Sequence, residues 1–539
     1  MLRCTRSCVL IRSVLITSSV QVDVLEKSLS KVSTKIRTMR NALVPANRLP
    51  LEVLQQIPSW HPYVRDIVAA SHVCRYWRAA FLSYPDLWTF IDCKSEHATH
   101  AFLQRSRLAR LDICIRPRYS SKAFSHTLPH IERWASLDVM VPREEIDPVL
   151  ASLSRPGPAP SQFSSLAITP MIGYEEDLIT SKGDILGGMI PSLRCLSLSN
   201  LEVEFHRLTA PNLTHLFLAG TRSEFIDMTI LLDFLEHSPL LQDFELRYPG
   251  PNLDIAHPDH VISLNHLRRI ILWDRGSVFL NHLVLPCGIE CELNFLFTNI
   301  SATTGFFEEV FEELPERLKP IFQAESLSIV PHYVHGSVRF MGPSGLVEIF
   351  PTFFYAESTS ITRFITYPPS VLIKVKNLFV GSRDGMIPEW RSTEVRKHLN
   401  KMSSLESLTI MRCNNASFMQ ALLPKKGKVP CPTLKNLTIH IGPIENFSIP
   451  TFRSMIKQRE LHGHKFEKMV LVFSHEHRIH PAIPNLEVKV DDRALFWDSK
   501  KKLWRYLNEG EIYWDGPRSL APPGIVSIGP IVPAMHLHV

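Results

Sequence analysis

The segment His475-Glu-His-Arg-Ile-His480 holds the densest group of side chains that could bind a metal. A zinc metalloprotease helix places two histidines four residues apart with a glutamate after the first, and here Ile479 occupies the position of the second. The three histidines could still bind an ion, but no further ligand lies at a recognisable spacing and Pro481 follows them. A solvated loop accounts for the segment better, and we predict no metal site.

The sequence also lacks the residue combinations that carry nucleophilic or phosphate chemistry. Gly342-Pro-Ser-Gly345 does not have the Gly-x-Ser-x-Gly spacing of a nucleophile elbow. There is no Gly-Lys-Ser/Thr phosphate loop, no Gly-x-Gly-x-x-Gly dinucleotide loop and no set of kinase motifs. We therefore predict no catalytic residue and no cofactor, and expect a protein that is not an enzyme.

The ten cysteines include no Cys-x-x-Cys pair, and they are too sparse for a disulfide scaffold. Cys287 and Cys291 lie in an apolar run, so we expect both in the hydrophobic core rather than as ligands. Five Asn-x-Ser/Thr sequences occur, but so short a motif arises by chance and supports secretion weakly. A reducing compartment, the cytoplasm or the nucleus, is the expected location.

The net charge of +6 belongs to the start of the chain. Residues 1–40 hold eight basic and two acidic side chains, and the rest of the chain holds 51 of each sign. A balanced body argues against a nucleic-acid-binding surface, and the lack of an 18-residue apolar run argues against a membrane span. Residues 1–22 have the acid-free, Arg-rich composition of a mitochondrial presequence, although we favour a poorly ordered leader over residues 1–23.

Apolar residues then recur with spacings of 4, 3, 4, 3 and 4, which is the heptad pattern of a helix with one apolar stripe. The stripe consists of Leu25, Leu29, Val32, Ile36, Met39 and Leu43. We predict a helix over residues 24–46 that Pro45 ends. Packing of this helix onto its own chain is favoured, and an oligomerising coiled coil is the alternative.

The next segment predicts three short helices with more apolar side chains than they can bury. Pro50 suits the first turn of a helix, Glu52 suits its positive end, and Pro58 is expected to end it. Further apolar runs surround residues 67–70 and 73–81. This excess of apolar area within 50 residues indicates a surface that binds a partner.

The same segment resembles the F-box, a module of about 45 residues that docks onto the Skp-type adaptor of cullin–RING ubiquitin ligases. The F-box pattern is Leu-Pro-x-Glu-Val/Ile-Leu-x-x-Ile, then Val-Cys-Lys/Arg-x-Trp-Arg, then x-Leu-Trp. Its positions are matched by Leu49, Pro50, Glu52, Val53, Leu54, Ile57, Val73, Cys74, Arg75, Trp77, Arg78, Leu87 and Trp88. The flanking sequence looks like that of F-box proteins from mushroom-forming fungi.

The resemblance implies a docking domain over residues 47–92 that binds the adaptor and, through it, a cullin. The residues that it assigns to adaptor binding are Leu49, Pro50, Leu54, Ile57, Val73, Cys74, Trp77, Leu87 and Trp88. The family has Phe where this chain has Pro58, so contacts just after the first helix are not carried over.

Over residues 93–490 a motif recurs in which positions 1, 4 and 6 are apolar. It begins at residues 108, 134, 163, 193, 213, 241 and 267, and again at 375, 405 and 434. Most of these starts lie 20–30 residues apart, as in leucine-rich repeats, and positions 4 and 6 alternate as on a short strand. Each unit cannot bury its own apolar face, so we predict an irregular leucine-rich-repeat-like α/β solenoid. An ordinary α/β domain with Leu-rich strands is the alternative.

Two regions fit the repeat less well. Residues 275–370 show no repeat and are predicted to be degenerate units or a sheet-rich insertion. Residues 491–539 combine five Trp and Tyr residues with Lys500–Lys502, and we favour a C-terminal cap with a Pro-rich tail over a binding segment for an acidic partner.

The sequence therefore predicts a mixed α/β protein with an N-terminal helix, a three-helix F-box and a repeat region. By resemblance, it is the substrate receptor of a cullin–RING ubiquitin ligase and binds an unknown protein substrate through the repeats. A scaffold that binds the adaptor without ubiquitin transfer is the first alternative, and an organellar enzyme with a metal on its His cluster is the second. We expect no nucleic-acid or membrane partner.

Overall fold

The structure is a computed structural model of the chain, and it divides into two compact units, Met1–Asp138 and Val139–Val539. The described residues are 2–60, 64–154, 160–171, 179–180, 185–202, 205–220, 228–247, 260–273, 279–297, 324–330, 337–342, 345–353, 372–381, 391–411, 415–425, 427–441, 447–473, 486–490, 495–498 and 503–506. The first compact unit extends beyond the predicted F-box of residues 47–92, since residues 93–138 also belong to it.

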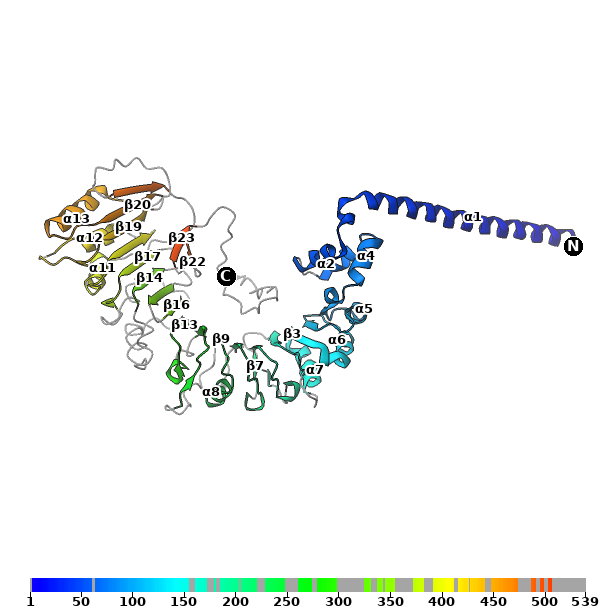
Figure 1. Cartoon of the computed structure of the whole chain (residues 1–539), viewed down its shortest axis with the longest axis horizontal. Helices are drawn as coiled ribbons and strands as arrows, with labels where there is room; N and C mark the ends of the chain where they lie inside the picture. The colour runs from blue at the N-terminus through cyan, green and yellow to red at the C-terminus, as the bar shows by residue number, and fades with distance from the viewer. Residues whose placement is uncertain are drawn as a thin grey trace. The chain divides into compact units, whose positions relative to one another are not determined.

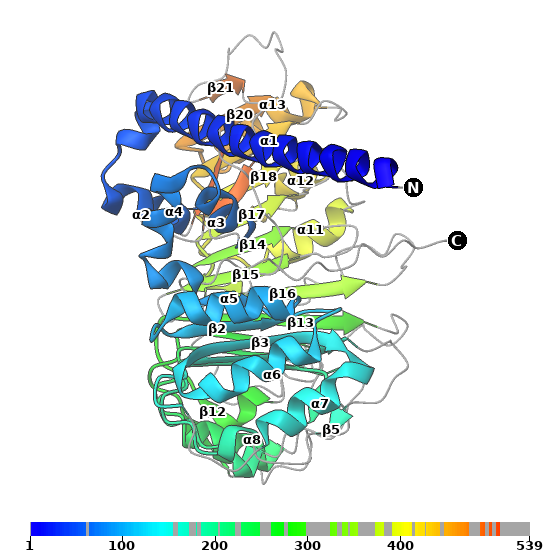
Figure 2. The same ribbon diagram turned by 90° about the vertical axis from the view of Figure 1, so that its right-hand side faces the viewer.

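The first unit is helical at its start and forms strands toward its end. Its elements are α1 (Leu2–Leu43), η1 (Pro45–Arg48), α2 (Leu51–Trp60), α3 (Val64–Ser71), α4 (Arg75–Leu82), η2 (Pro85–Trp88), β1 (Phe90–Asp92), α5 (Glu96–Ser106), β2 (Leu111–Ile115), α6 (Ser121–Thr127), η3 (Leu128–Arg133) and the first residues of β3 (Trp134–Pro142). Strands β1 and β2 are parallel. Figure 2 shows α2, α3 and α4 close to one end of the long helix α1.

Helix α1 corrects two of the sequence predictions. It runs unbroken from Leu2 to Leu43, so the expected poorly ordered leader of residues 1–23 is helical. The physical reason is that no glycine or proline precedes Pro45, and nothing else in the segment stops a helix. The heptad stripe does not pack onto any other described part of the first unit either, because its six side chains are all 56–71% exposed.

Helix α2 also differs from its prediction, because it continues past Pro58 to Trp60. A proline removes one N–H group and crowds the carbonyl four residues before it. This cost does not prevent one more turn when the remaining backbone groups keep their partners. Pro58 is therefore part of the last turn of α2 rather than its end.

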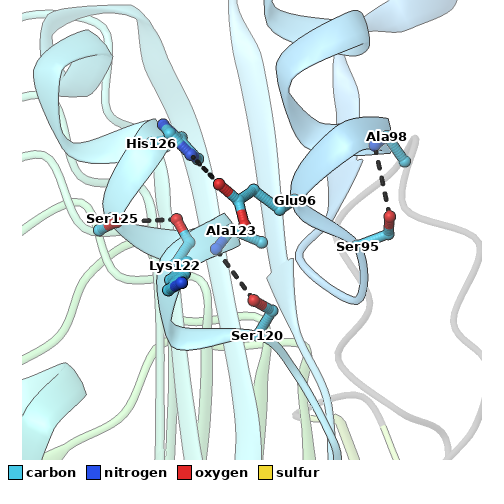
Figure 3. A network of polar contacts seen from close by, with 8 residues as sticks. All are labelled: Ser95, Glu96, Ala98, Ser120, Lys122, Ala123, Ser125 and His126. Atoms are coloured by element: carbon cyan, nitrogen blue, oxygen red, sulfur yellow. Dashed lines mark hydrogen bonds and ion pairs between the residues drawn. The ribbon is translucent and has the colours of Figure 1, made fainter.

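Side-chain caps begin the next two helices of the first unit (Figure 3). Ser95 accepts a hydrogen bond from the backbone N–H of Ala98 at the start of α5, and Ser120 accepts one from Ala123 at the start of α6. Glu96 and His126 connect the two helices at 3.2 Å, and this contact lowers the pKa of Glu96. Capping of both N-termini sets where the helices begin and how they face each other.

The second unit is built from short strands joined by helices and turns. Its helices are α7 (Arg143–Leu153), η4 (Ile185–Gly187), η5 (Phe205–Arg207), α8 (Met228–Glu236), α11 (Ser392–Leu399), α12 (Asn415–Leu422) and α13 (Ile449–Leu461). Its strands after β3 are β4 (Ser165–Met171), β5 (Ile179–Thr180), β6 (Cys195–Ser199), β7 (Leu201–Glu202), β8 (His215–Ala219), β9 (Asp243–Arg247), β10 (Ile262–Ser263), β11 (Arg269–Trp273), β12 (Leu283–Val284), β13 (Ile289–Phe297), β14 (Ser326–Val330), β15 (Ser337–Gly342), β16 (Gly345–Phe353), β17 (Asn377–Gly381), β18 (Ser407–Met411), β19 (Asn436–Ile441), β20 (Lys468–Phe473), β21 (Leu486–Val490), β22 (Leu495–Asp498) and β23 (Leu503–Tyr506).

One row of paired strands runs through this unit. Strands β4, β6, β8, β9, β11 and β13 pair in parallel in that order, and β14, β17, β18, β19, β20 and β21 form a second parallel series. Strands β15 and β16 join the two series, since β16 pairs with β13 and β15 pairs with β14. Helices α11, α12 and α13 lie side by side along the second series (Figure 1).

The recurring apolar motif coincides with these strands. Positions 1, 4 and 6 of all ten units are buried, with the single exception of Leu108. In most units the N–H of position 1 bonds to the carbonyl three residues earlier, as Leu213 does with Ala210 and Leu405 with Met402. The motif therefore describes a turn that leads into a strand with one buried face. Leu108 is 91% exposed because it lies in the turn between α5 and β2.

The described part of residues 275–370 is sheet-rich, with strands β12 to β16. Gly345 begins β16 with a φ of +138°, and it allows β16 to approach β13, because a Cβ there would lie 2.2 Å from the carbonyl oxygen of Ile289. Gly342 pairs with Gly345 across the hairpin of β15 and β16. A side chain at Gly345 would therefore prevent the close backbone approach.

The remaining sequence predictions concern the cysteines, a membrane span and the C-terminal tail. Cys291 is buried as expected, but Cys287 is exposed because it sits in the turn before Gly288, whose φ is +84°. All cysteines of the described part that the structure assigns are free thiols. The described helices include none long and apolar enough to cross a membrane. The tail contributes an antiparallel pair, β22 and β23, whereas Lys500–Lys502 lie outside the described residues.

Candidate docking surface and sheet face

Helices α2, α3 and α4 are held together by a small core of their own. Leu54 and Phe81 are fully buried, and Ile67 is almost so. Gln55 donates to the carbonyl of Ala80 at 3.3 Å, which joins the middle of α2 to α4. One apolar face on each short helix therefore supplies the packing that the helices need, since helices of this length are not stable alone.

Three of the predicted adaptor-binding residues are buried in the first unit. Leu54, Leu87 and Trp88 have exposures of 8% or less. The ring of Trp88 packs edge-on against Phe102 with centroids 5.0 Å apart, and the guanidinium of Arg105 lies 4.3 Å above it. These α5 side chains lie beyond the predicted boundary at residue 92. Part of the apolar surface that seemed to exceed what the three helices can bury is therefore buried by α5.

The other predicted residues lie where a partner could touch them. Pro50 and Val73 are exposed, and Leu49, Cys74 and Trp77 are half-buried. The side chain of Ile57 lies outside the described residues.

Hydrogen bonds bring the start of α2 next to the start of α4. The hydroxyl of Tyr76 donates to the carbonyl of Leu49 at 2.8 Å, and the thiol of Cys74 lies 3.7 Å from the side-chain oxygen of Asn47. Asn47 in turn donates to the carbonyl of Asn41 at 2.7 Å, which ties this junction to the end of α1. Exposed apolar side chains from both helices thus occupy one rigid surface.

Four further apolar side chains are exposed at this junction and were not assigned to binding from the sequence. They are Val44, Leu51, Val53 and Tyr76, with exposures of 36–44%. A signal was available for Val53, which the F-box pattern matches, but not for Leu51, which lies three residues before Leu54 and so shares its face of the helix. We call the set Leu49, Pro50, Leu51, Val53, Val73 and Tyr76 the docking surface.

A second candidate surface lies on the face of the first strand series opposite the motif positions, where most side chains are half-buried and Ser199, Glu245 and Ile271 are buried. Residues that alternate with the buried motif positions form three rows across β6, β8, β9, β11 and β13. The first row is Cys195, His215, Asp243, Arg269 and Glu290; the second is Ser197, Phe217, Glu245, Ile271 and Glu292; the third begins with Ser199, Ala219, Arg247 and Trp273. We call these three rows the sheet face.

The sheet face centres on an arginine held between aromatic rings. The guanidinium of Arg247 lies 5.1 Å from the ring centroid of Phe217 and 5.1 Å from that of Trp273. It also donates to Glu245, whose pKa is raised by burial even though Arg247 acts against the shift. Arg269 bonds to Glu292 at 3.4 Å in the neighbouring row. A rigid aromatic and charged surface of this kind is typical of protein-binding sites.

A histidine in the first row has three polar neighbours, which are Asp243, Cys195 and the hydroxyl of Thr214, 2.8 Å from its Nδ1. The Nε2 of His215 is 3.0 Å from a carboxylate oxygen of Asp243, and its Nδ1 is 3.7 Å from the sulfur of Cys195. The hydrogen bond to Asp243, followed by that to Cys195, raises the pKa of His215 to about 9. The imidazole is therefore protonated at neutral pH. It places a fixed positive charge on β8, between Cys195 of β6 and Asp243 of β9.

The ion pair between His215 and Asp243 makes the stability of the second unit depend on pH. A pKa raised in the folded state stabilises the fold below the unfolded value near 6.5, and the contribution is lost as the pH rises through about 9. We expect a loss on the order of 1 kcal/mol between pH 6.5 and 9.5, since solvent partly screens the pair. The Asp243→Asn variant should flatten this slope in urea unfolding curves. An equal slope in the wild type and the variant would contradict the assignment.

One group of metal-binding side chains occurs among the described residues. Asp233, Glu236 and His260 place one ligand atom each within 4.8 Å of one another, with both carboxylates exposed. Sequence reasoning missed the group because His260 follows α8 by more than 20 residues. Exposed acidic residues commonly lie this close without an ion, so the group does not support a metal centre. The histidine-rich segment of residues 475–480, for which we predict no metal site, lies outside the described residues.

Comparison with known families bears on the segment that contains the docking surface. Residues 46–94 match the F-box-like family model. The match contains all of α2, α3 and α4 and every residue of the docking surface. The chain thus carries an F-box-like domain, a module for protein–protein interaction, and domains of this kind in general bind Skp-type adaptors. Among curated proteins, none matches this chain.

Proposed function

We propose that this protein is the substrate receptor of a cullin–RING ubiquitin ligase. The observation that carries the proposal is the match of residues 46–94 to the F-box-like family together with the exposed apolar residues of the docking surface. The docking surface would bind the Skp-type adaptor, and the adaptor would connect the chain to a cullin. No catalytic residue of this chain is needed, because holding a substrate near activated ubiquitin raises the effective concentration of the two reactants.

We assign substrate binding to the second unit and, within it, to the sheet face. We further propose that the repeating units form a leucine-rich-repeat-like solenoid. Support comes from the parallel in-register pairing of successive strands and from the turn that precedes most of them. Stacked units of this kind expose one continuous face of strands, which suits a protein ligand.

The first experiment is co-purification of the full-length chain with a Skp-type adaptor and a cullin. Aspartate in place of both Val53 and Val73 should reduce adaptor recovery about tenfold or more, because a partner would then bury two unpaired charges. Both side chains are exposed, at 42% and 57%, so the fold should tolerate the change. The matched control is Leu108→Asp, an exposed apolar residue outside the family match. Undiminished recovery of the adaptor with the double variant would refute the docking assignment.

The same experiment separates the proposal from a scaffold function. Recovery of the adaptor and the cullin together supports a ligase receptor, whereas recovery of the adaptor alone supports an F-box scaffold without ubiquitin transfer. The cytoplasm or the nucleus is the proposed location, since the ligase acts there. An organellar metalloenzyme would instead bind a stoichiometric metal that the His477→Ala variant loses.

A further inference from the structure

Helix α1 presents an apolar stripe that no other described part of the chain covers. Its six residues, Leu25, Leu29, Val32, Ile36, Met39 and Leu43, are 56–71% exposed and follow one another at alternating spacings of four and three. In heptad terms Leu29, Ile36 and Leu43 take position a, and Leu25, Val32 and Met39 take position d. A stripe of this width is the seam of a two-stranded coiled coil, and it is too apolar to favour exposure to water.

We propose that α1 pairs with α1 of a second copy of this chain in an antiparallel coiled coil. In one alignment every apolar residue of the stripe meets an apolar residue of the partner. The layers are then Leu25 with Leu43, Leu29 with Met39, and Val32 with Ile36, each formed twice. This inference does not rest on the proposed function, because it concerns a helix that lies outside the family match.

The charged residues beside the stripe favour an antiparallel coiled coil over a parallel one. Glu26 and Arg40 occupy e positions, and Lys35 occupies a g position. The antiparallel pair places Glu26 of each copy near Arg40 of the other, which gives two attractive contacts, and only Lys35 faces its own equivalent. A parallel pair would place Lys35 beside Arg40 twice and would bring Glu26 beside uncharged Gln21.

The alignment also determines how far apart the pair holds its two F-box-like domains. Leu43 of each copy lies beside Leu25 of the other, so the two Leu43 residues are 18 helix positions apart. At a rise of 1.5 Å per residue this separation is about 27 Å along the axis. Since the domain begins just after Leu43, a dimer would present its two docking surfaces near the two ends of the paired segment, residues 25–43.

The experiment measures the molar mass of the full-length protein by sedimentation equilibrium. The wild type should approach twice 61.5 kDa as its concentration rises. Ile36→Asp should give the mass of a single chain, and the control Lys31→Asp, on the same helix but off the stripe, should remain a dimer. Circular dichroism checks that both variants keep their helix. A wild type that stays at 61.5 kDa, or an unchanged dimer with Ile36→Asp, would overturn the proposal.

Charge exchange tests the direction of the pair. Arg40→Glu should weaken an antiparallel dimer about tenfold because it creates two Glu–Glu contacts, and adding Glu26→Arg should restore the affinity. A parallel dimer would respond to Arg40→Glu in the opposite way, since Lys35 would gain a partner. Stronger association of the single variant therefore overturns the antiparallel alignment. A wild type that is monomeric alone but loses adaptor binding with Ile36→Asp would show that the stripe binds the adaptor instead.

Discussion

Replacing Trp88 with alanine is expected to destabilise the N-terminal unit by about 3–5 kcal/mol. The ring is fully buried, and its indole N–H donates to the carbonyl of Phe81 at 2.9 Å. Phe102 and Arg105 contact it from α5, so the substitution would leave a cavity between α4 and α5. The loss would also leave the carbonyl of Phe81 with one fewer donor, which adds to the cost of the cavity.

Native-state hydrogen exchange measures this effect in a chain with two units. Peptides that cover α4, β1 and α5 should exchange faster in Trp88→Ala, whereas peptides from β17 to β20 should not change. Leu108→Ala serves as the control, because its side chain is 91% exposed and surface substitutions usually change stability by less than about 0.5 kcal/mol. Equal exchange of the two variants across α4 and α5 would show that Trp88 is not a core residue.

Replacing Arg459 with methionine is expected to destabilise the end of the second strand series by about 2–3 kcal/mol. Arg459 is fully buried, and its two terminal nitrogens donate to the carbonyls of Pro430 and Cys431 at 2.7 and 2.9 Å. Its guanidinium also lies 5.1 Å from the ring centroid of Phe466. Methionine fills much of the volume, but it leaves the carbonyl of Pro430 buried without this donor.

Burial lowers the pKa of Arg459 to about 10, so the group remains charged at neutral pH and its carbonyl partners matter more. Lysine should not restore stability, since a single ammonium group cannot reproduce the planar fork that meets two carbonyls. The control is Arg453→Met on the same helix, where the side chain is exposed. Exchange of amides in α13 and β19 should increase for Arg459→Met and stay the same for the control. An equal response of the two variants would contradict this account.

The apolar spacing of the sequence was enough to locate the strands of the second unit. Residues such as Leu216 and Leu218, or Leu408 and Ile410, are buried where the motif placed them. Period-two burial is a local property, because successive side chains of a strand point to opposite faces whatever lies beyond it. The same reasoning could not place the sheet face. Which exposed residues become neighbours depends on the register between strands, and no pattern within one strand sets it.

For the docking surface, too, the sequence predicted local features but not the tertiary contacts. Its helices and its family resemblance followed from residues close together in the sequence, as with Pro50 at the start of α2. The roles of Leu54 and Trp88 did not, because their cover comes from Phe81, Phe102 and other residues outside the recognised motif. The sequence alone does not distinguish an apolar motif residue that packs inside its own domain from one that binds a partner.

Two properties of the chain were therefore decided by sequence alone: the helical stripe of α1, whose spacing is independent of any contact, and the strand-forming motif of the second unit. Tertiary structure decided whether those apolar residues are covered. It buried the motif positions by pairing each strand with the next, and it left the stripe of α1 exposed. The physical reason is that hydrophobic burial depends on what else reaches a surface, and that is a property of the whole fold rather than of a segment.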